Sequence, residues 1–200
     1  MVAPYNKILM IYIEPTPYIL GLINAIRLHW QGQIDVLFLY ENYTQRWNIQ
    51  DENNNKILFS NNIKRIFQIL SQLSIKKYDY LHLAGWGSSL FLLLILVAKY
   101  KKMLVSIESD TPMPPHTAWW KRVIKRQVYP IIFSFVDVFL PGGKKQAKYL
   151  EHYGVQSKFI YQVQMTVDIK KIKRYISTLN HVDCQKTRQC YKICKSDIVF

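Results

Sequence analysis

The sequence predicts an α/β domain with an open, mostly parallel β-sheet and helices on both faces of that sheet. Short apolar runs rich in β-branched and aromatic residues alternate with segments in which apolar residues recur every three or four positions. The chain has 200 residues, of which 50% are hydrophobic, and only 7 are Gly and 8 are Pro. This composition is sufficient to bury a core and excludes disordered, collagen-like and mucin-like chains.

The first hundred residues predict four strands and three helices. The run Lys7–Ile13 is apolar and β-branched, as expected of a buried strand, and Pro15 and Pro17 end it. Residues 60–62 supply polar side chains that cap helices. The helix after them carries one apolar stripe, at Ile63, Ile66, Phe67, Leu70 and Leu73. Strands are expected at 7–13, 34–40, 56–59 and 80–83, and helices at 18–30, 63–73 and 88–100.

The second hundred residues continue this alternation and then change character. Strands are expected at 103–107, 136–140 and 159–163, and helices at 119–128, 144–153 and 168–179. Residues 180–195 are polar with little apolar periodicity, which predicts a connector, and Ser196–Phe200 resembles the start of another strand. We therefore expect one domain at 1–179, followed at 180–200 by a connector and the first strand of a second domain that lies beyond this sequence.

Charge indicates a polyanionic partner. The net charge is +14, and 18 of the 27 Lys and Arg residues lie in the second half of the chain. Nucleic acid, an anionic membrane surface and a phosphorylated substrate all fit this excess. The longest wholly apolar run, Leu90–Ala98, is too short to cross a bilayer, and no secretory leader is evident. These features predict a cytoplasmic protein.

The three cysteines predict neither a disulfide framework nor a metal site. Cys184, Cys190 and Cys194 are an odd set in a chain without a leader, which fits a reducing compartment. Their spacings of six and four do not match the paired spacing of a structural zinc site. We expect no metal and no resident cofactor.

Three unusual segments follow predicted strands, and such segments meet at the ligand-binding edge of a parallel sheet. They are Glu14–Gly21, Gly85–Ser89 and Glu108–His116. In the first, a helix start attracts anions, and the candidate binding residues are Thr16, Tyr18 and Gly21. The alternative is a rigid connection in which Thr16 only caps the helix.

The second and third segments each leave two interpretations open. Gly85, Trp86 and Gly87 form either a ligand loop with an exposed Trp for stacking, or a tight turn with Trp86 as a lid on the core. They lack the third glycine of the dinucleotide-binding fingerprint. Glu108 and Asp110 are candidate catalytic carboxylates, acting as a general base or holding sugar hydroxyls, with His116 nearby. The alternative is local turn bonding by Asp110 and a solvated His116.

The helix at 119–128 is amphipathic, basic and rich in tryptophan. On a helical wheel its apolar residues fill one half and its basic residues fill the other. This pattern is typical of a helix lying in a membrane interface, and it is also shown by a surface helix whose apolar side packs on a sheet. The candidate membrane-surface residues are Trp119, Trp120, Lys121, Arg122, Lys125 and Arg126.

The order of these segments resembles the N-terminal half of a GT-B glycosyltransferase of the retaining family four. The most similar part is Val136–Gly143, followed by Tyr149-Leu150, Tyr153-Gly154-Val155 and Met165–Asp168. Asp79–Trp86, Ser106–Asp110 and Thr16-Pro17-Tyr18 add shorter similarities. The resemblance covers about residues 5–172 and implies a Rossmann-like sheet, with Gly142 and Gly143 among the substrate-binding residues. Many family members carry a His where this chain has Glu108.

The resemblance implies a two-domain enzyme whose first half binds the acceptor and whose second half binds a nucleotide-sugar co-substrate. The expected acceptor is lipid-linked or a polysaccharide, and the expected location is the inner face of the cytoplasmic membrane. We expect the 200-residue chain alone to transfer no sugar, and the two alternatives are a truncated enzyme and one half of a split enzyme whose donor domain is a separate chain. The alternative is a basic, non-enzymatic module that binds a membrane surface or nucleic acid; no sequence-specific nucleic-acid motif is present.

Overall fold

The computed structural model describes residues 6–41, 56–57, 62–112, 118–163, 169–178 and 181–194. The chain divides into two compact units, Met1–Met165 and Thr166–Phe200. The first unit contains the β-sheet. In the part of the second unit that the structure describes, the helices are α6 (Ile169–Thr178) and α7 (His181–Cys190). The predicted helix at 168–179 is observed as α6 in the second unit, and the expected domain boundary at 179 stays a prediction.

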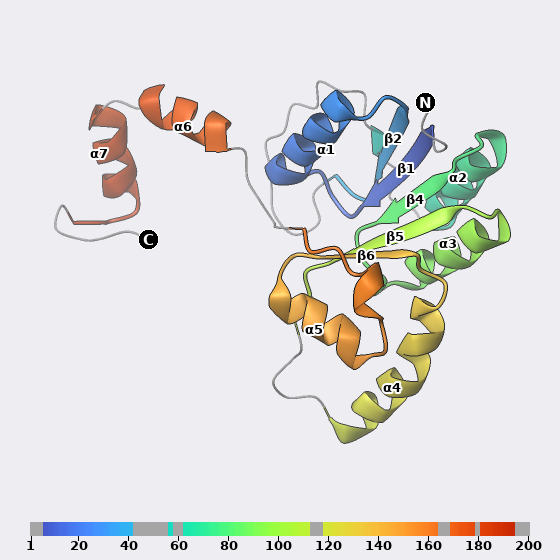
Figure 1. Ribbon diagram of the computed structural model, residues 1–200. Coiled ribbons are helices and arrows are strands. Elements are labelled where there is room, and N and C mark those ends of the chain that lie inside the picture. Colours follow the sequence, from blue (N-terminus) through green and yellow to red (C-terminus); the bar gives the residue numbers. More distant parts are fainter. Residues whose placement is uncertain are drawn as a thin grey trace. The chain divides into compact units, whose positions relative to one another are not determined.

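The first unit is built on a parallel sheet of six strands in the order β3-β2-β1-β4-β5-β6 (Figure 1). All five strand pairs are parallel. The strands are β1 (Lys7–Tyr12), β2 (Gln33–Phe38), β3 (Lys56–Ile57), β4 (Tyr80–Leu83), β5 (Leu104–Ser109) and β6 (Val138–Pro141). The helices are α1 (Pro17–His29), α2 (Asn62–Ile75), α3 (Ser89–Tyr100), α4 (Trp119–Phe133) and α5 (Lys144–His152). The predicted α/β fold class is confirmed.

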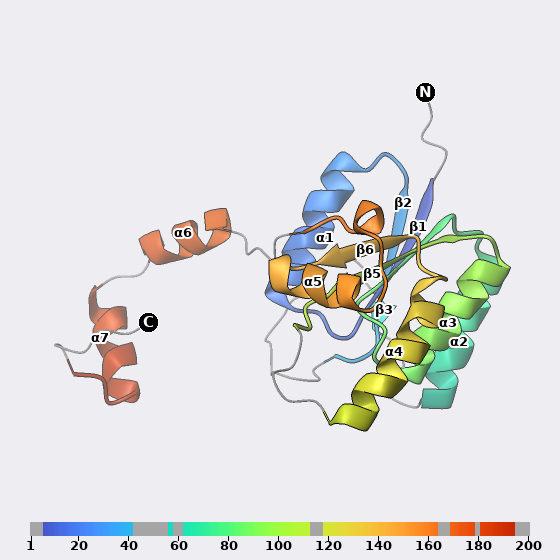
Figure 2. The same cartoon turned by 60° about the horizontal axis from the view of Figure 1, so that its bottom comes forward.

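The strand order places helices on both faces of the sheet. The chain runs from β1 outward to β3, returns to β4 beside β1, and then continues outward in the opposite direction. Because parallel crossovers are right-handed, this reversal puts α1 on one face and the later helices on the other (Figure 1, Figure 2). Two buried clusters reflect the two layers: α1 adds Ile23 to one, and α2, α3, α4 and α5 add Ile69, Leu94, Phe133 and Leu150 to the other.

Strand β5 shows how the sequence alternates between these two layers. Val105 and Ile107 are buried in the larger cluster, and successive side chains of a strand point to opposite faces. Ser106 and Glu108 therefore face the α1 side of the sheet. Ser106 and Glu108 thus lie in one layer, and Val105 and Ile107 lie in the other.

Two aspartates anchor the starts of strands. Asp79, just before β4, accepts hydrogen bonds through Oδ2 from the backbone N–H groups of Asn6 and Lys7 at 2.9 and 3.0 Å. Asp137, just before β6, accepts one from the backbone N–H of Val105 at 2.8 Å and pairs with Lys99 at 2.7 Å. Each carboxylate ties a strand to its neighbour and thereby fixes the register.

Several helix boundaries follow from capping. Thr16 precedes α1, and its side chain accepts a hydrogen bond from the backbone N–H of Ile19, with Pro17 at the first helical position. Ser88 caps α3 in the same way, accepting from the backbone N–H of Phe91 at 3.2 Å. The predicted starts at 18 and 88 are therefore one residue from the observed ones.

Three predicted elements are wrong in extent or type. Helix α4 continues to Phe133 through Pro130, because Ser134 N–H still reaches the Pro130 carbonyl. Residues 159–163 form no strand; a 3₁₀ turn at Ser157–Phe159 precedes a single parallel bridge between Phe139 and Ile160. The predicted connector contains α7. Its Gln, Lys and Arg residues favour a helix, although apolar residues do not recur at helical spacing in this segment.

The apolar stripe predicted on α2 is also shifted. Phe67 is exposed, and among the α2 residues whose burial is described, 64–75, the buried ones are Arg65, Ile69 and Leu73, spaced four residues apart. Parts of three predicted features lie outside the described residues. They are the second half of the predicted strand at 56–59, the end of the family-like segment at 164–168 and the predicted final strand at 196–200. Among the described residues, no helix has the length and hydropathy needed to cross a bilayer.

A polar network at the amino edge of the sheet gives the fold a pH dependence. Asp35 of β2 accepts hydrogen bonds from Lys76 Nζ at 2.6 Å, Tyr78 Oη at 2.5 Å and Gln33 Nε2 at 3.1 Å. Burial alone raises the pKa of this carboxyl. The hydrogen bonds and the Lys76 charge outweigh burial, so the pKa of Asp35 lies below its ordinary value of 3.8.

We predict that Lys76→Met lowers the free energy of unfolding more at neutral pH than in strong acid. Because the folded-state pKa of Asp35 is depressed, its contribution is complete above 3.8 and is lost as the pH falls through the lower folded-state value. Urea denaturation over this range measures the difference. Lys77→Met, which changes an exposed neighbour, is the control. Losses for K76M that are the same at every pH would contradict the prediction.

Candidate functional site

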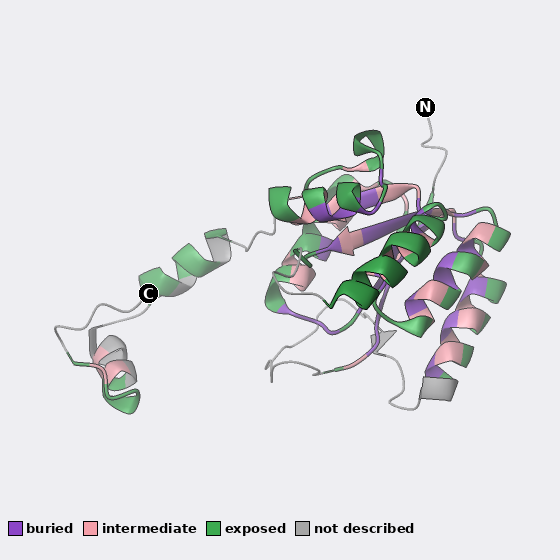
Figure 3. Cartoon of the chain, turned by 90° about the horizontal axis from the view of Figure 1, so that it is seen from below, coloured by how far each residue is buried: buried purple, intermediate pink, exposed green. Residues whose placement is uncertain are grey.

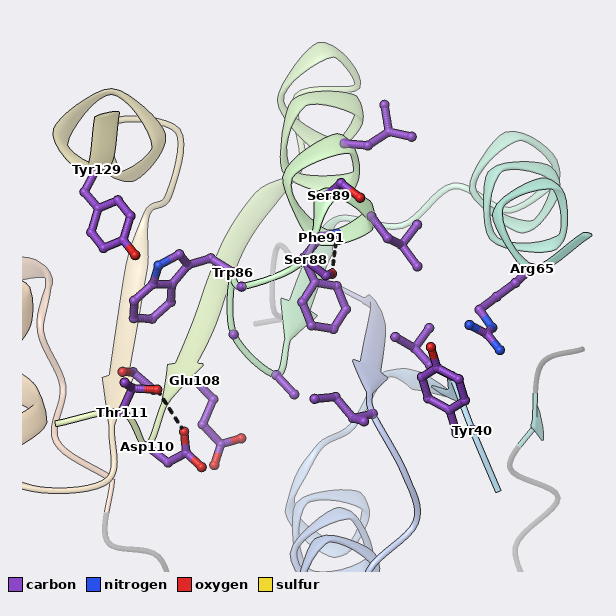
Figure 4. Close-up of a pocket in the computed structure, with 18 of the residues that line it drawn as sticks. Tyr40, Arg65, Trp86, Ser88, Ser89, Phe91, Glu108, Asp110, Thr111 and Tyr129 are labelled. Atoms are coloured by element: carbon purple, nitrogen blue, oxygen red, sulfur yellow. Dashed lines mark hydrogen bonds between the residues drawn. The ribbon is translucent and has the colours of Figure 1, made fainter. Parts of the chain in front are cut away.

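A cavity of about 770 Å³ lies at the carboxyl edge of the sheet (Figure 4). Its wall is formed by the loops after β4 and β5 together with side chains from α2, α3, α4 and α5. Ligands of open parallel sheets bind at this edge, because the loops leave a crevice outside the strand ends. The cavity is therefore the candidate site of this unit.

The loop after β4 contributes Gly85, Trp86, Gly87, Ser88 and Ser89 to the lining. Gly85 has φ +110°, a left-handed conformation that favours glycine and turns the chain from β4 toward α3. At Gly87 an added side chain would meet no atom within 4 Å, so open space surrounds this position. The loop thus directs its backbone and the first turn of α3 toward the cavity.

Trp86 is buried rather than exposed, with only 9% of its surface accessible. Its ring lies edge-on to Phe133 at 5.2 Å and to Tyr129 at 6.3 Å, and it stacks with Tyr149 at 6.5 Å. These contacts support the interpretation in which Trp86 covers the core. They do not support the alternative in which an exposed Trp86 stacks on a ligand. Trp86 still lines the cavity, because one part of the residue faces it.

Glu108 and Asp110, the predicted catalytic carboxylates, both line the cavity. They are two positions apart at the end of β5, so an extended chain directs both to the same face. Asp110 is exposed; its carboxylate accepts a hydrogen bond from Thr111 Oγ1, and its backbone carbonyl accepts one from Gln146 Nε2 of α5 at 3.2 Å. The local turn bonding weighed for Asp110 is therefore present, and it leaves Glu108 free of that role.

Sequence reasoning missed the basic and phenolic groups of the wall. Arg65 of α2 is only 2% exposed, and its guanidinium lies 4.1 Å from the centre of the Tyr40 ring. Lys125 of α4 donates a hydrogen bond to Tyr149 Oη at 3.4 Å. Figure 4 shows Arg65 and Tyr40 at one end of the cavity and Trp86 and Tyr129 at the other. The sequence held one indication that Arg65 is buried: it lies four positions before Ile69 and therefore on the same side of α2, which faces the core.

Tyr149 remains protonated at neutral pH. Burial raises the pKa of its hydroxyl above the ordinary value, and the neighbouring Tyr129 raises it further. The hydroxyl can therefore both donate and accept a hydrogen bond at the cavity wall. Together with the serines of the α3 loop, it gives the cavity several neutral hydrogen-bonding groups between the acidic and basic ones.

The remaining predicted site residues lie elsewhere or outside the described chain. Thr16 is buried as the cap of α1, and neither it nor Tyr18 nor Gly21 lines the cavity, which receives only Ile13 from that connection. Gly142 and Gly143 lie between β6 and α5 and do not line it either. His116 lies outside the described residues. The structure thus brings together two of the three predicted segments at the cavity.

The outer side of α4 is exposed along most of its length (Figure 3). Trp119 is 73% exposed, and Trp120, Val123, Ile124, Val128 and Ile131 are exposed as well. Packing on the core is confined to the end of the helix, at Phe133 with Tyr129 and Ile132. The alternative in which the apolar stripe packs on the sheet therefore fails for most of the helix. Lys121, Arg122 and Arg126 are exposed, and Lys125 is half-buried at the cavity.

We predict that Trp86→Ala lowers the free energy of unfolding by about 3–5 kcal/mol, because it removes the centre of an aromatic cluster. Trp86→Phe keeps part of the packing and should cost less. Trp119→Ala, at an exposed position, should change stability by less than about 0.5 kcal/mol. Urea denaturation of the three variants measures these effects. Equal losses for W86A and W119A would show that Trp86 is not a core residue.

No protein-family model matches the sequence, and no curated protein matches it significantly. Solved structures do match the fold. UDP-N-acetylglucosamine 2-epimerase from Rickettsia bellii has a TM-score of 0.58 at 15% identity, over 91% of this chain and 51% of its own. Anabaena Alr3699/HepE in complex with UDP and glucose has a TM-score of 0.63 at 11% identity, over 94% of this chain and 50% of its own.

A third match is UDP-GlcNAc 2-epimerase from Neisseria meningitidis bound to UDP-GlcNAc, with a TM-score of 0.52 at 13% identity over 86% of this chain and 52% of its own. At these identities the similarity establishes the fold alone. The chain spans about half the length of the structures it matches. Its fold is therefore the Rossmann-like α/β fold found in one half of GT-B-like enzymes.

Proposed function

We propose that this chain is the acceptor-binding half of a glycosyltransferase that moves a sugar from a nucleotide-sugar to a lipid-linked or polysaccharide acceptor. The observation that carries the proposal is the cavity at the carboxyl edge of the sheet, where Glu108 and Asp110 share the lining with hydroxyl groups. Support comes from the half-length similarity to GT-B-like enzymes whose structures contain UDP or UDP-sugars. The resemblance of residues 136–168 to retaining family-four enzymes supports the finer assignment.

The cavity offers the groups that an acceptor hydroxyl requires. A carboxylate accepts a hydrogen bond from a sugar hydroxyl, and it can take the proton as that hydroxyl attacks a donor sugar. Tyr129, Tyr149 and Ser88 can orient other hydroxyls, and Arg65 supplies a fixed positive charge. In this proposal the nucleotide is held by a second half, so residues 1–200 alone are expected not to transfer sugar.

Helix α4 is the proposed membrane contact. Its exposed tryptophans and aliphatic residues lie on one half of the helix and Lys121, Arg122 and Arg126 on the other, and interfacial helices combine these two features. Each basic residue near an anionic surface contributes about 1 kcal/mol of attraction. Since anionic lipids are abundant in the cytoplasmic leaflet, the proposal places the chain on the inner face of the membrane, where lipid-linked acceptors are accessible.

The sugar site is tested by saturation-transfer NMR of the chain with methyl glucoside, methyl N-acetylglucosaminide and UDP as separate probes. We expect transfer to at least one methyl glycoside, and its loss in Glu108→Gln combined with Asp110→Asn. Glu151→Gln, which removes an exposed carboxylate outside the cavity, is the matched control.

Two results would contradict the acceptor assignment. Binding of UDP without binding of either glycoside would favour a donor site or an epimerase-type half, since an epimerase acts on the nucleotide-sugar itself. Sugar transfer from UDP-glucose or UDP-GlcNAc by residues 1–200 alone would show that no second half is needed.

The membrane contact is tested by flotation with vesicles of phosphatidylcholine, with and without phosphatidylglycerol. We expect binding to the anionic vesicles and a loss of roughly a hundredfold in affinity when Lys121, Arg122 and Arg126 are changed to Gln, since three charges are removed. Replacement of Lys101, Lys145 and Lys158 by Gln removes the same charge from other exposed positions and should cost far less. Binding to mixed oligonucleotides at physiological salt without flotation would favour the nucleic-acid alternative.

A further inference from the structure

A group of polar side chains lies behind the cavity, on the α1 face of the sheet. The register pairs His82 of β4 with Ser106 of β5 and with Met10 of β1. Glu108 follows Ser106 by two positions and therefore points to the same face. Parallel neighbouring strands thus place His82, Ser106 and Glu108 together, close to the edge where the cavity opens.

His82 is almost completely buried, with 4% of its surface exposed. One ring nitrogen is satisfied, because Nδ1 lies 2.8 Å from Ser106 Oγ. The other nitrogen, Nε2, is buried and has no hydrogen-bond partner among the described residues. Nε2 is therefore the ring nitrogen that can make a further hydrogen bond.

Nε2 faces the Glu108 carboxylate, at 3.7 Å from Oε2. This distance exceeds that of a hydrogen bond, but the Glu108 side chain is 25% exposed and can rotate to shorten it. Contacts of this kind are often long without a ligand and shorten when one binds. Because Glu108 also lines the cavity, one side of its carboxylate meets the ligand space and the other meets the imidazole.

Tyr12 at the end of β1 lies beside His82 as well. Its ring lies 5.4 Å from that of His82, and its buried hydroxyl has no hydrogen-bond partner among the described residues. Burial raises the pKa of Tyr12, and the negative charge of Glu108 raises it further, so the hydroxyl keeps its proton. Tyr12 is thus a second neutral donor close to the charge of Glu108.

A purely structural role explains this group poorly. A buried polar atom without a partner costs about 1–3 kcal/mol, and apolar residues of similar size avoid that cost. The neighbouring positions of β1 on the same face are filled by the apolar residues Ile8 and Met10. A buried His and a buried Ser therefore lie where β4 and β5 approach Glu108, a carboxylate of the cavity.

We propose that Ser106, His82 and Glu108 form a hydrogen-bonded relay that orients the Glu108 carboxylate toward a ligand hydroxyl in the cavity. The Ser106 hydroxyl donates to Nδ1, which leaves the proton on Nε2, and Nε2–H donates to Glu108. The other carboxylate oxygen then accepts the hydrogen bond of a sugar hydroxyl. His82 is a positioning residue in this arrangement. The assignment of the ligand as a sugar rests on the proposed function, whereas the relay itself does not.

The relay is tested without any ligand by long-range ¹H–¹⁵N NMR of the chain labelled at its 5 histidines, with the His82 signals assigned from His82→Gln. We expect a proton on Nε2 of His82 and a clear shift of that signal in Glu108→Gln. Ser106→Ala should remove the preference for this tautomer. Asp110→Asn, which changes the other cavity carboxylate, is the control and should leave the signal in place.

Two results would overturn the relay. One is a His82 ring that carries its proton on Nδ1 and not on Nε2. The other is an Nε2 signal that moves no more in Glu108→Gln than in Asp110→Asn. A cooperative thermal transition for each variant shows that it is folded, and Ser106→Ala provides a small change if a His82 variant fails to fold.

The positioning role is tested by saturation transfer from the chain to methyl glucoside and methyl N-acetylglucosaminide. We expect His82→Leu to weaken binding about as much as Glu108→Gln, and His82→Gln, which keeps an N–H at the ε position, to restore most of it. Equal binding by H82L and wild type would overturn the positioning role. If neither glycoside binds the wild type, the proposed function fails, while the ¹⁵N result still decides whether the relay exists.

Discussion

The parallel register of β1, β4 and β5 is the constraint on which the site depends. Because these strands are neighbours and run in the same direction, the residues at their carboxyl ends reach one edge. The same register, combined with the alternation of β5, places Ile107 in the apolar core and Glu108 next to His82. Asp79 and Asp137 hold this register from the opposite edge. The chemistry of the cavity is thus a consequence of how the sheet is assembled.

Helix α4 has two different sides. Its last turns pack against the core through Phe133, and Lys125 and Tyr129 line the cavity. Its outer side exposes tryptophans and basic residues along most of its length. An element with these two sides can bring a membrane surface and a ligand cavity close together without a moving part. This is the physical reason that the proposed membrane contact and the proposed acceptor site are mutually consistent.

The fold was predictable because strand and helix periods are strong and caps such as Thr16 and Ser88 are local signals. Two of the three segments expected at the site line the cavity, and these follow the neighbouring strands β4 and β5. Glu14–Gly21 also follows a strand and does not line the cavity, so position after a strand is not sufficient to place a segment there. Burial was less predictable. Trp86 lies in an aromatic cluster assembled from α4 and α5, and Arg65 occupies a core position of α2, so both depend on tertiary contacts. The partnership of His82 with Glu108 depends on strand register, which a single sequence does not specify.

The central claim is that the cavity at the carboxyl edge binds a hydroxyl-rich ligand at Glu108. The most direct measurement is a backbone ¹H–¹⁵N titration of the chain with methyl glucoside. We expect the shifted amides to cluster in the loop after β4 with the start of α3, at residues 84–90, and at the end of β5 with the loop after it, at residues 108–111. Shifts spread over α6 and α7, or centred on α1 without the two loops, would contradict the account.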